Sequence, residues 1–236
     1  MEEQYKDYTI ADLCSIVSAK NYALSSKKDG NEGIALYVGR KYDMGKTLAF
    51  FTHNLQESGY YVHCDDKQLL LYIAFILNSY VGMLFLHNEG SDEYGKGSVT
   101  MKNLGAVRIC MIPDNYIKAC NILELIIGRV SSSNADEDVK EAKEATISLL
   151  TDMRNFISLE IYMKPVFVEH QVSVLEPWDK FVNEKGVLYN WDTIDGAIKS
   201  FYKAILDPEN EVMDAIKKAR MFVWELFETL KKSVAK

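Results

Sequence analysis

Short apolar runs separated by polar stretches fill the first half of the chain, and their composition predicts β-strands. The runs are rich in valine, isoleucine and aromatic residues, which suit the pleated surface of a sheet. The predicted strands are residues 15–17, 33–38, 48–52, 60–64, 99–101 and 107–112. A polar step at 102–105, which we interpret as a turn, separates the last two strands, and Pro113 closes the second.

Two capping signals in the same half predict helices. Thr9 and Asp12 have the spacing of a capping box, which predicts a single helical turn before the strand at 15–17. Asp65 and Asp66 precede a stretch in which apolar residues recur every three or four positions, the period of a helix. Those apolar residues are Leu69, Leu70, Ile73, Ile76, Leu77 and Tyr80. The first half therefore combines a mixed or antiparallel sheet with one main helix.

After Pro113 the apolar residues follow helical spacing. The first helix of this part is predicted to end near Gly128, and residues 131–134 (SSSN) form the clearest linker in the chain. A second helix is predicted from residue 135 through Ile157, because acidic residues in its first turn suit the helix dipole.

The remaining segment predicts an irregular stretch followed by two more helices. Pro165 and Pro177 bound the irregular stretch, and the helices are placed at 193–206 and 208–233. The whole pattern predicts an α+β fold: a β-rich domain at 1–130, followed by an all-helical region at 135–236.

The composition is that of a folded chain without a membrane span. The 236 residues are 48% hydrophobic with four prolines, and no run of eighteen apolar residues predicts a spanning helix. The polar, acidic start has no signal-peptide shape. Four cysteines lie far apart without a C-x-x-C pair, which favours reduced thiols over a disulfide or zinc framework. We therefore expect a cytoplasmic location and no membrane partner.

The net charge of −7 lowers the expectation of tight, unaided binding to DNA. Residues 1–113 carry 11 Lys and Arg against 13 Asp and Glu, or −2, and residues 114–236 carry 16 against 21, or −5. Local basic loops can still neutralise phosphates. From composition alone, simple solvation of these loops is the more economical interpretation.

Motifs for catalysis and metal binding are incomplete. Residues 90–97 resemble a phosphate-binding loop but end in glycine where a hydroxyl is needed, and 45–47 (GKT) lacks the first glycine. His53, His63 and His87 show no metal-ligand spacing. The Pro-Asp pair that ends one strand resembles a nuclease motif without its lysine. We therefore expect no catalytic residue, no cofactor and no metal.

Three segments, in this order, resemble the target-recognition domain of the DNA-specificity (S) subunit of type I restriction–modification systems. They are residues 8–17 (YTIADLCSIV), 65–79 (DDKQLLLYIAFILNS) and 97–113 (GSVTMKNLGAVRICMIP). The similarity covers about residues 8–130, and its specificity lies in the order of the segments. The chain departs from the family in lacking a glutamine after Pro113 and in being acidic.

The resemblance implies a non-catalytic subunit that reads one half of a split sequence in double-stranded DNA. Such a subunit holds a methyltransferase subunit and, through it, the restriction subunit. Half-length relatives pair with themselves, so the resemblance also implies a homodimer. The residues expected to face DNA are Lys27, Lys28, Arg40, Lys41, Lys46, Tyr94 and Lys96.

Two other functions are also compatible with the sequence. The first is a protein-interaction or decoy module that retains the recognition fold without strong DNA binding, which the −5 charge of the helical half favours. The second is an enzyme whose site is built from scattered residues.

Overall fold

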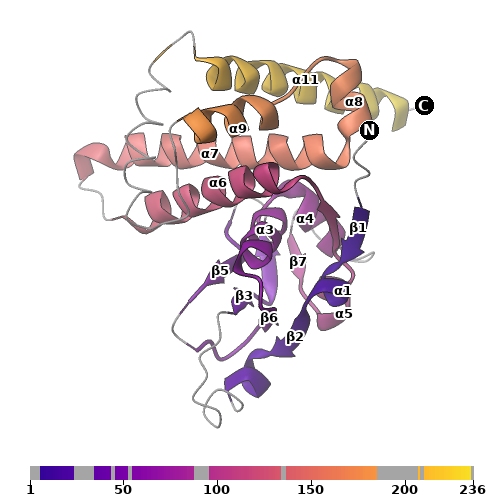
Figure 1. The fold of residues 1–236 in the computed structure, drawn as a ribbon, viewed down its shortest axis with the longest axis vertical. Helices are drawn as coiled ribbons and strands as arrows, with labels where there is room; N and C mark the ends of the chain where they lie inside the picture. The colour runs from indigo at the N-terminus through magenta and orange to yellow at the C-terminus, as the bar shows by residue number, and fades with distance from the viewer. Residues whose placement is uncertain are drawn as a thin grey trace. The chain divides into compact units, whose positions relative to one another are not determined.

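The chain has an α+β fold with a C-terminal helical region, as the sequence predicted (Figure 1). The computed structural model describes residues 6–23, 35–43, 46–52, 55–87, 96–133, 137–184, 207 and 210–234. It divides into two compact units, Met1–Pro113 and Asp114–Lys236. The division falls at Pro113, earlier than the serine linker at which the sequence placed it, so the first long helix belongs to the second unit.

The first unit holds three small antiparallel sheets. A four-stranded sheet has the order β2-β6-β3-β5, and β1-β8 and β4-β7 form two-stranded ribbons. The strands are β1 (Lys6–Thr9), β2 (Ser15–Ser18), β3 (Leu36–Val38), β4 (Lys41–Asp43), β5 (Ala49–Phe51), β6 (Tyr60–His63), β7 (Lys96–Ser98) and β8 (Arg108–Met111). The helices of this unit whose bounds lie within the described residues include α1 (Ile10–Leu13), α3 (Lys67–Leu77), α4 (Tyr80–Leu86) and α5 (Met101–Gly105).

The main helix, α3, packs on β3 and β5 of the four-stranded sheet. Asp66 caps it, accepting hydrogen bonds from the backbone N–H groups of Gln68 (2.8 Å) and Leu69 (3.2 Å). Leu70 and Ile73 are fully buried in this unit, as is Leu36 of β3. Each such side chain stabilises the fold by about 1.5–3 kcal/mol, so burial of the helical face predicted from sequence holds the sheet and helix together.

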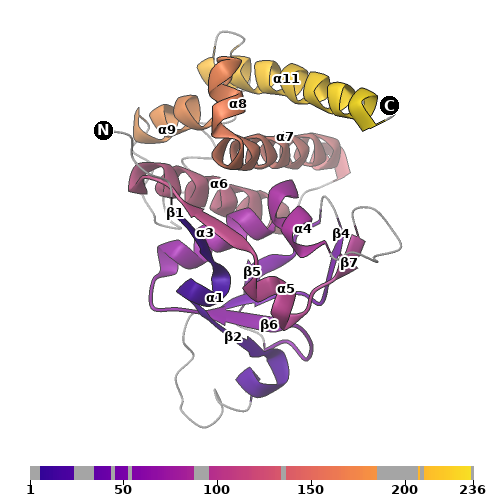
Figure 2. The ribbon, with the colours of Figure 1, turned by 90° about the vertical axis from the view of Figure 1, so that its right-hand side faces the viewer.

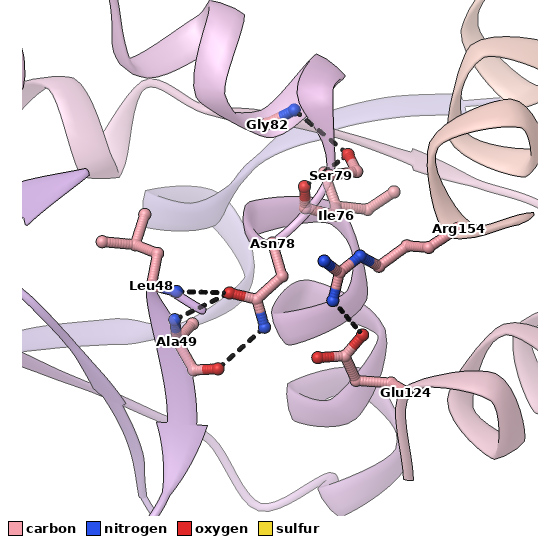
Figure 3. Close-up of polar contacts among 8 residues, drawn as sticks. All are labelled: Leu48, Ala49, Ile76, Asn78, Ser79, Gly82, Glu124 and Arg154. Carbon is pink, nitrogen blue, oxygen red and sulfur yellow. Dashed lines mark hydrogen bonds and ion pairs between the residues drawn. The ribbon is translucent and has the colours of Figure 1, made fainter. Parts of the chain in front are cut away.

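The Asn78 side chain ties the end of α3 to the edge strand β5 (Figure 3). Its Oδ1 accepts from the N–H groups of Leu48 (2.7 Å) and Ala49 (2.9 Å), and its Nδ2 donates to the Ala49 carbonyl (2.8 Å). At Gly82 of α4 an added Cβ would lie 2.0 Å from the Ile76 carbonyl oxygen, so only glycine permits this approach.

Among the described residues no single helix is long and apolar enough to cross a membrane; α3 and α4 together meet that test, but with an 81° bend between them.

The segment 97–113 differs in part from its prediction. The strand β8 is confirmed. The strand predicted at 99–101 is wrong, because β7 ends at Ser98 and α5 begins at Met101, and the polar step is the helix α5 rather than a turn. Thr100 caps α5 and forms a reciprocal capping box with Asn103. The Asn103 Nδ2 also donates to the carbonyls of Leu86 (3.0 Å) and Ser98 (3.1 Å). The pattern does not predict α5, because a five-residue helix is too short to show a helical period, although the sequence contains its capping residues.

The second unit is all-helical among its described residues. Its helices are α6 (Asp114–Ser132), α7 (Glu137–Tyr162), α8 (Lys164–Glu169), α9 (Leu175–Glu184) and α11 (Glu211–Val234). Within this unit α7 lies along α6 and also contacts α8 and α11, while α9 packs on α6 and α11 (Figure 2). Arg154 of α7, 2% exposed, donates from Nη1 to Glu124 Oε2 of α6 at 3.1 Å, so the buried guanidinium is neutralised inside the helix pair (Figure 3).

The interhelical segment after α7 is more ordered than predicted. Pro165 and Pro177 lie in the first turns of α8 and α9, where a missing N–H costs no helical hydrogen bond, so the predicted irregular stretch is wrong there. The predicted end near Gly128 is also wrong, because α6 continues to Ser132. The predicted helix at 193–206 lies outside the described residues.

Candidate nucleic-acid interface

The basic segment around Arg40 and the segment containing Lys96 meet in the β4–β7 ribbon. The register pairs Lys41 with Ser98 and Asp43 with Lys96. The Val99 N–H donates to the Arg40 carbonyl at 2.7 Å, which extends the contact beyond the ribbon's end. The sequence predicts DNA-facing loops for both segments, whereas the structure makes β4 and β7 paired strands. The sequence could not predict this pairing, because partners 53 to 57 residues apart leave no local signal in the chain.

Tyr42 anchors this ribbon from its buried side. Its side chain is buried and its hydroxyl lies 3.1 Å from Nδ1 of His87. A Cβ added at Gly97 would lie 2.5 Å from the Tyr42 hydroxyl oxygen and 2.6 Å from two ring carbons. Glycine at 97 therefore lets the tyrosine ring lie against the opposite strand, which fixes the ribbon's position in the first unit.

Three predicted cations are exposed on and beside β4: Arg40, Lys41 and Lys46. The Lys46 Nζ lies 2.7 Å from Asp43 Oδ2, so part of its charge is offset locally. An exposed pair of this kind is worth at most about 1 kcal/mol, and a phosphate can compete for the ammonium. The surface can therefore offer two lysine contacts to phosphates and one planar guanidinium to a base edge.

The other predicted DNA-facing side chains are not placed. Lys27, Lys28 and Tyr94 lie outside the described residues. Lys96 is described through its backbone in β7, opposite Asp43, but not through its side chain. Their contact with DNA stays a prediction from the sequence.

A row of aromatic rings crosses the four-stranded sheet next to this surface and was missed in the sequence. Tyr61, Tyr37 and Phe50 occupy one register position on β6, β3 and β5, with ring centroids 5.6 Å and 5.1 Å apart. Tyr22 stacks on Tyr61 at 4.1 Å. The three rings line up because they occupy paired positions on neighbouring strands, and only the strand register shows that they are paired.

The row ends at the sheet edge in Phe50, which is 40% exposed. Burial and the neighbouring Tyr61 raise the pKa of the Tyr37 hydroxyl, and the positive charge of Arg40 partly opposes that rise. The exposed Phe50 at the sheet edge can add apolar contact with a thymine methyl group.

The described part of the chain gathers no group of three or more His, Cys, Asp or Glu side chains that could hold a metal ion. Comparison with protein-family models, curated proteins and solved structures finds no match to this chain.

Proposed function

We propose that this chain is the sequence-specific DNA-recognition subunit of a restriction–modification system, in a single-domain form that pairs with itself. In this proposal the first unit binds double-stranded DNA, and the helical unit docks the methyltransferase subunit, which recruits the restriction subunit. The chain itself is non-catalytic and needs no cofactor. The restriction–modification assignment is supported by the ordered resemblance of residues 8–17, 65–79 and 97–113 to the specificity subunits.

The observation that carries DNA binding is the β4–β7 ribbon with its exposed cations. The major groove of B-form DNA admits a two-stranded β-ribbon, and strands in a groove place alternate side chains toward the bases. Lys41 and Lys46 position the ribbon on phosphates, and Arg40 reads a guanine through its O6 and N7 atoms.

Local charge and net charge act at different ranges, which reconciles an acidic chain with this role. At about 0.1 M salt the screening length is about 10 Å, so distant carboxylates add little to a contact at the ribbon. The first unit is also the less acidic part of the chain, at −2 against −5. Binding by the ribbon alone is expected to be weak, and docking of a methyltransferase subunit adds the remaining contacts.

The test reverses charge on the ribbon and measures the salt dependence of binding. Fluorescence anisotropy with a labelled mixed-sequence duplex, above 0.1 M salt, is run with and without a methyltransferase subunit. The double variant Lys41→Glu/Lys46→Glu should bind several-fold more weakly, with a salt slope lower by about 2, since each lost phosphate contact removes about 0.9. An unchanged slope contradicts the assignment.

Lys6→Glu/Lys67→Glu is the matched control. Both residues are exposed in the first unit, and the two changes shift the net charge from −7 to −11, as the ribbon variant does. Because Lys6 and Lys67 lie on β1 and at the start of α3, this control should keep the wild-type slope. Equal loss in both variants would show that net charge, and not the ribbon, governs binding.

A second candidate is a protein-interaction module without useful DNA affinity. It is favoured by Met221 and Trp224 of α11, which lie three residues apart on one helical face and are 67% and 66% exposed. Large exposed apolar side chains of this kind mark protein-binding surfaces. Capture of a methyltransferase subunit without any duplex binding, at low salt and with that subunit present, would favour this candidate over the first.

A further inference from the structure

Two cysteines lie opposite each other where the β2–β6 pairing ends. The antiparallel register pairs Ser15 with His63, and extending it by one residue places Cys14 opposite Cys64. Cys14 keeps an extended backbone (φ −142°, ψ 158°), so it continues the direction of β2 for one more residue. Directly opposite residues of antiparallel strands have Cα atoms about 4.5–5.5 Å apart, within the range of about 4.4–6.8 Å that a disulfide spans.

Both thiols lie at this end of the strand pair. The Cys64 Sγ donates to the Asp66 carbonyl at 3.4 Å. Both cysteines are thiols that are only partly buried, whereas the thiols of Cys110 and Cys120 are buried. Burial, together with the neighbouring Cys64, raises the pKa of Cys14 to about 12. The raised pKa keeps the Cys14 thiol protonated near neutral pH, so we expect the first attack on an oxidant to come from Cys64.

We propose that Cys14 and Cys64 are a site of reversible oxidative modification, closing an intramolecular disulfide when the protein meets a low-molecular-weight disulfide. The site is independent of DNA binding and does not rest on the proposed function. Cys14 lies between α1 and β2, and Cys64 lies between β6 and α3, so residues 50 positions apart in the sequence meet at the end of one strand pair.

The reaction proceeds in two exchange steps with oxidised glutathione as the oxidant. The Cys64 thiolate attacks one sulfur of the reagent, breaks its S–S bond and forms a mixed disulfide, releasing one glutathione thiolate. The Cys14 thiolate then attacks the Cys64 sulfur, forms the Cys14–Cys64 bond and releases the second glutathione thiolate. The two cysteine protons end on the two released glutathiones, so two protein thiols are oxidised and one reagent disulfide is reduced.

Closing this disulfide has a measurable effect on stability. The bond joins Cys14, the C-cap of α1, to the residue two before Asp66, the N-cap of α3. The closed loop contains β3, β4 and β5, and a cross-link over a loop of this length restricts the unfolded chain. The urea midpoint of the oxidised protein should therefore be higher than that of the reduced protein, and dithiothreitol should reverse the shift.

The experiment incubates the full chain with oxidised glutathione and maps the products by intact-mass and peptide mass spectrometry. We expect the native protein to lose two hydrogen atoms, to fall from four free thiols to two, and to yield one cross-linked peptide containing Cys14 and Cys64. The Cys14→Ser variant should stop at a single glutathione adduct on Cys64. The Cys110→Ser variant, altered at a buried thiol outside the pair, should still form the Cys14–Cys64 cross-link.

Three outcomes would overturn the proposal. The first is a folded wild-type chain that keeps four free thiols at saturating oxidant, and the second is a cross-link that joins any other pair. The third is a Cys64→Ser variant that gives the same two-hydrogen loss as the wild type. Circular dichroism of each variant establishes that it is folded before oxidation, so a failed fold is not mistaken for an unreactive site.

Discussion

Glu160 shows how a single half-buried carboxyl positions an element. Its two oxygens accept hydrogen bonds from Ser173 Oγ (2.6 Å) and from the N–H groups of Val174 (2.8 Å) and Leu175 (3.0 Å), at the start of α9. Trp178 of the same helix is fully buried and donates from Nε1 to the Ala119 carbonyl at 2.9 Å. One glutamate therefore caps the helix that carries the largest side chain of this core.

The protonation of Glu160 should make stability depend on pH. Burial raises the pKa of this carboxyl, and the charge of Glu176 adds to the rise, although the three hydrogen bonds oppose it. Between the ordinary glutamate pKa and the raised one, the native state holds a proton that the unfolded state has lost. The free energy of unfolding should therefore fall as pH rises through that window.

Glu160→Gln should flatten this pH dependence. A glutamine amide resembles the protonated carboxyl, since its oxygen can accept from the two N–H groups while its nitrogen donates to Ser173 Oγ. Urea unfolding at a series of pH values, followed by tryptophan fluorescence, measures the effect. Glu141→Gln, an exposed change on the same helix, should keep the wild-type dependence. Equal profiles for all three proteins would show that another group titrates in the window.

At the scale of elements, the β4–β7 ribbon depends on a glycine facing a tyrosine ring. Gly97→Ala should destabilise the first unit by about 1–3 kcal/mol, because the new methyl group overlaps the buried ring of Tyr42. It should also weaken duplex binding several-fold by displacing β4. Gly39→Ala is the neighbouring control: its Cβ would meet only ordinary contacts at 3.7 Å, and we expect a change within about 0.5 kcal/mol.

Urea denaturation and anisotropy measure both variants. If Gly97→Ala is as stable as Gly39→Ala and binds DNA as well, then Tyr42 does not hold the ribbon in place. A loss of stability with unchanged binding would separate the packing of the ribbon from its proposed contact with DNA.

The elements that the sequence predicted are those with a local cause. The helix α3 follows from apolar spacing and the Asp66 cap, and α1 from the Thr9 capping box, which the structure confirms. For the strand β4 the sequence predicts a loop, because its three residues, two of them charged, show no strand period. Candidate cations at 40, 41 and 46 were visible as a basic cluster, but their pairing with β7 and the aromatic row depend on register, which distant segments determine.

At the scale of the whole molecule, an acidic chain with a local basic ribbon should have an unusual salt dependence. Lowering the salt from about 0.1 M to 0.01 M lengthens screening from about 10 Å to 30 Å. The remaining charge of a chain at −7 then repels DNA while the ribbon attracts it. The plot of log affinity against log salt should therefore flatten below about 0.03 M, where a basic DNA-binding protein would stay linear.

Anisotropy titrations down to 0.01 M salt measure this curvature. The Lys6→Glu/Lys67→Glu variant, at −11, should flatten earlier than the wild type while matching it above 0.1 M. A straight line for both proteins to the lowest salt would contradict the prediction. It would mean that the carboxylates of the chain do not repel DNA at long range.

The pairing of β1 with β8 also has a consequence for biosynthesis. Lys6 pairs with Met111, so the first strand of the unit finds its partner only after 105 further residues have been made. At about 5–20 residues per second, β1 waits about 5–20 seconds as the chain grows. The first unit cannot close co-translationally until its last strand emerges, so its earliest segment is the one most exposed to chaperones and to pairing with a neighbouring nascent chain.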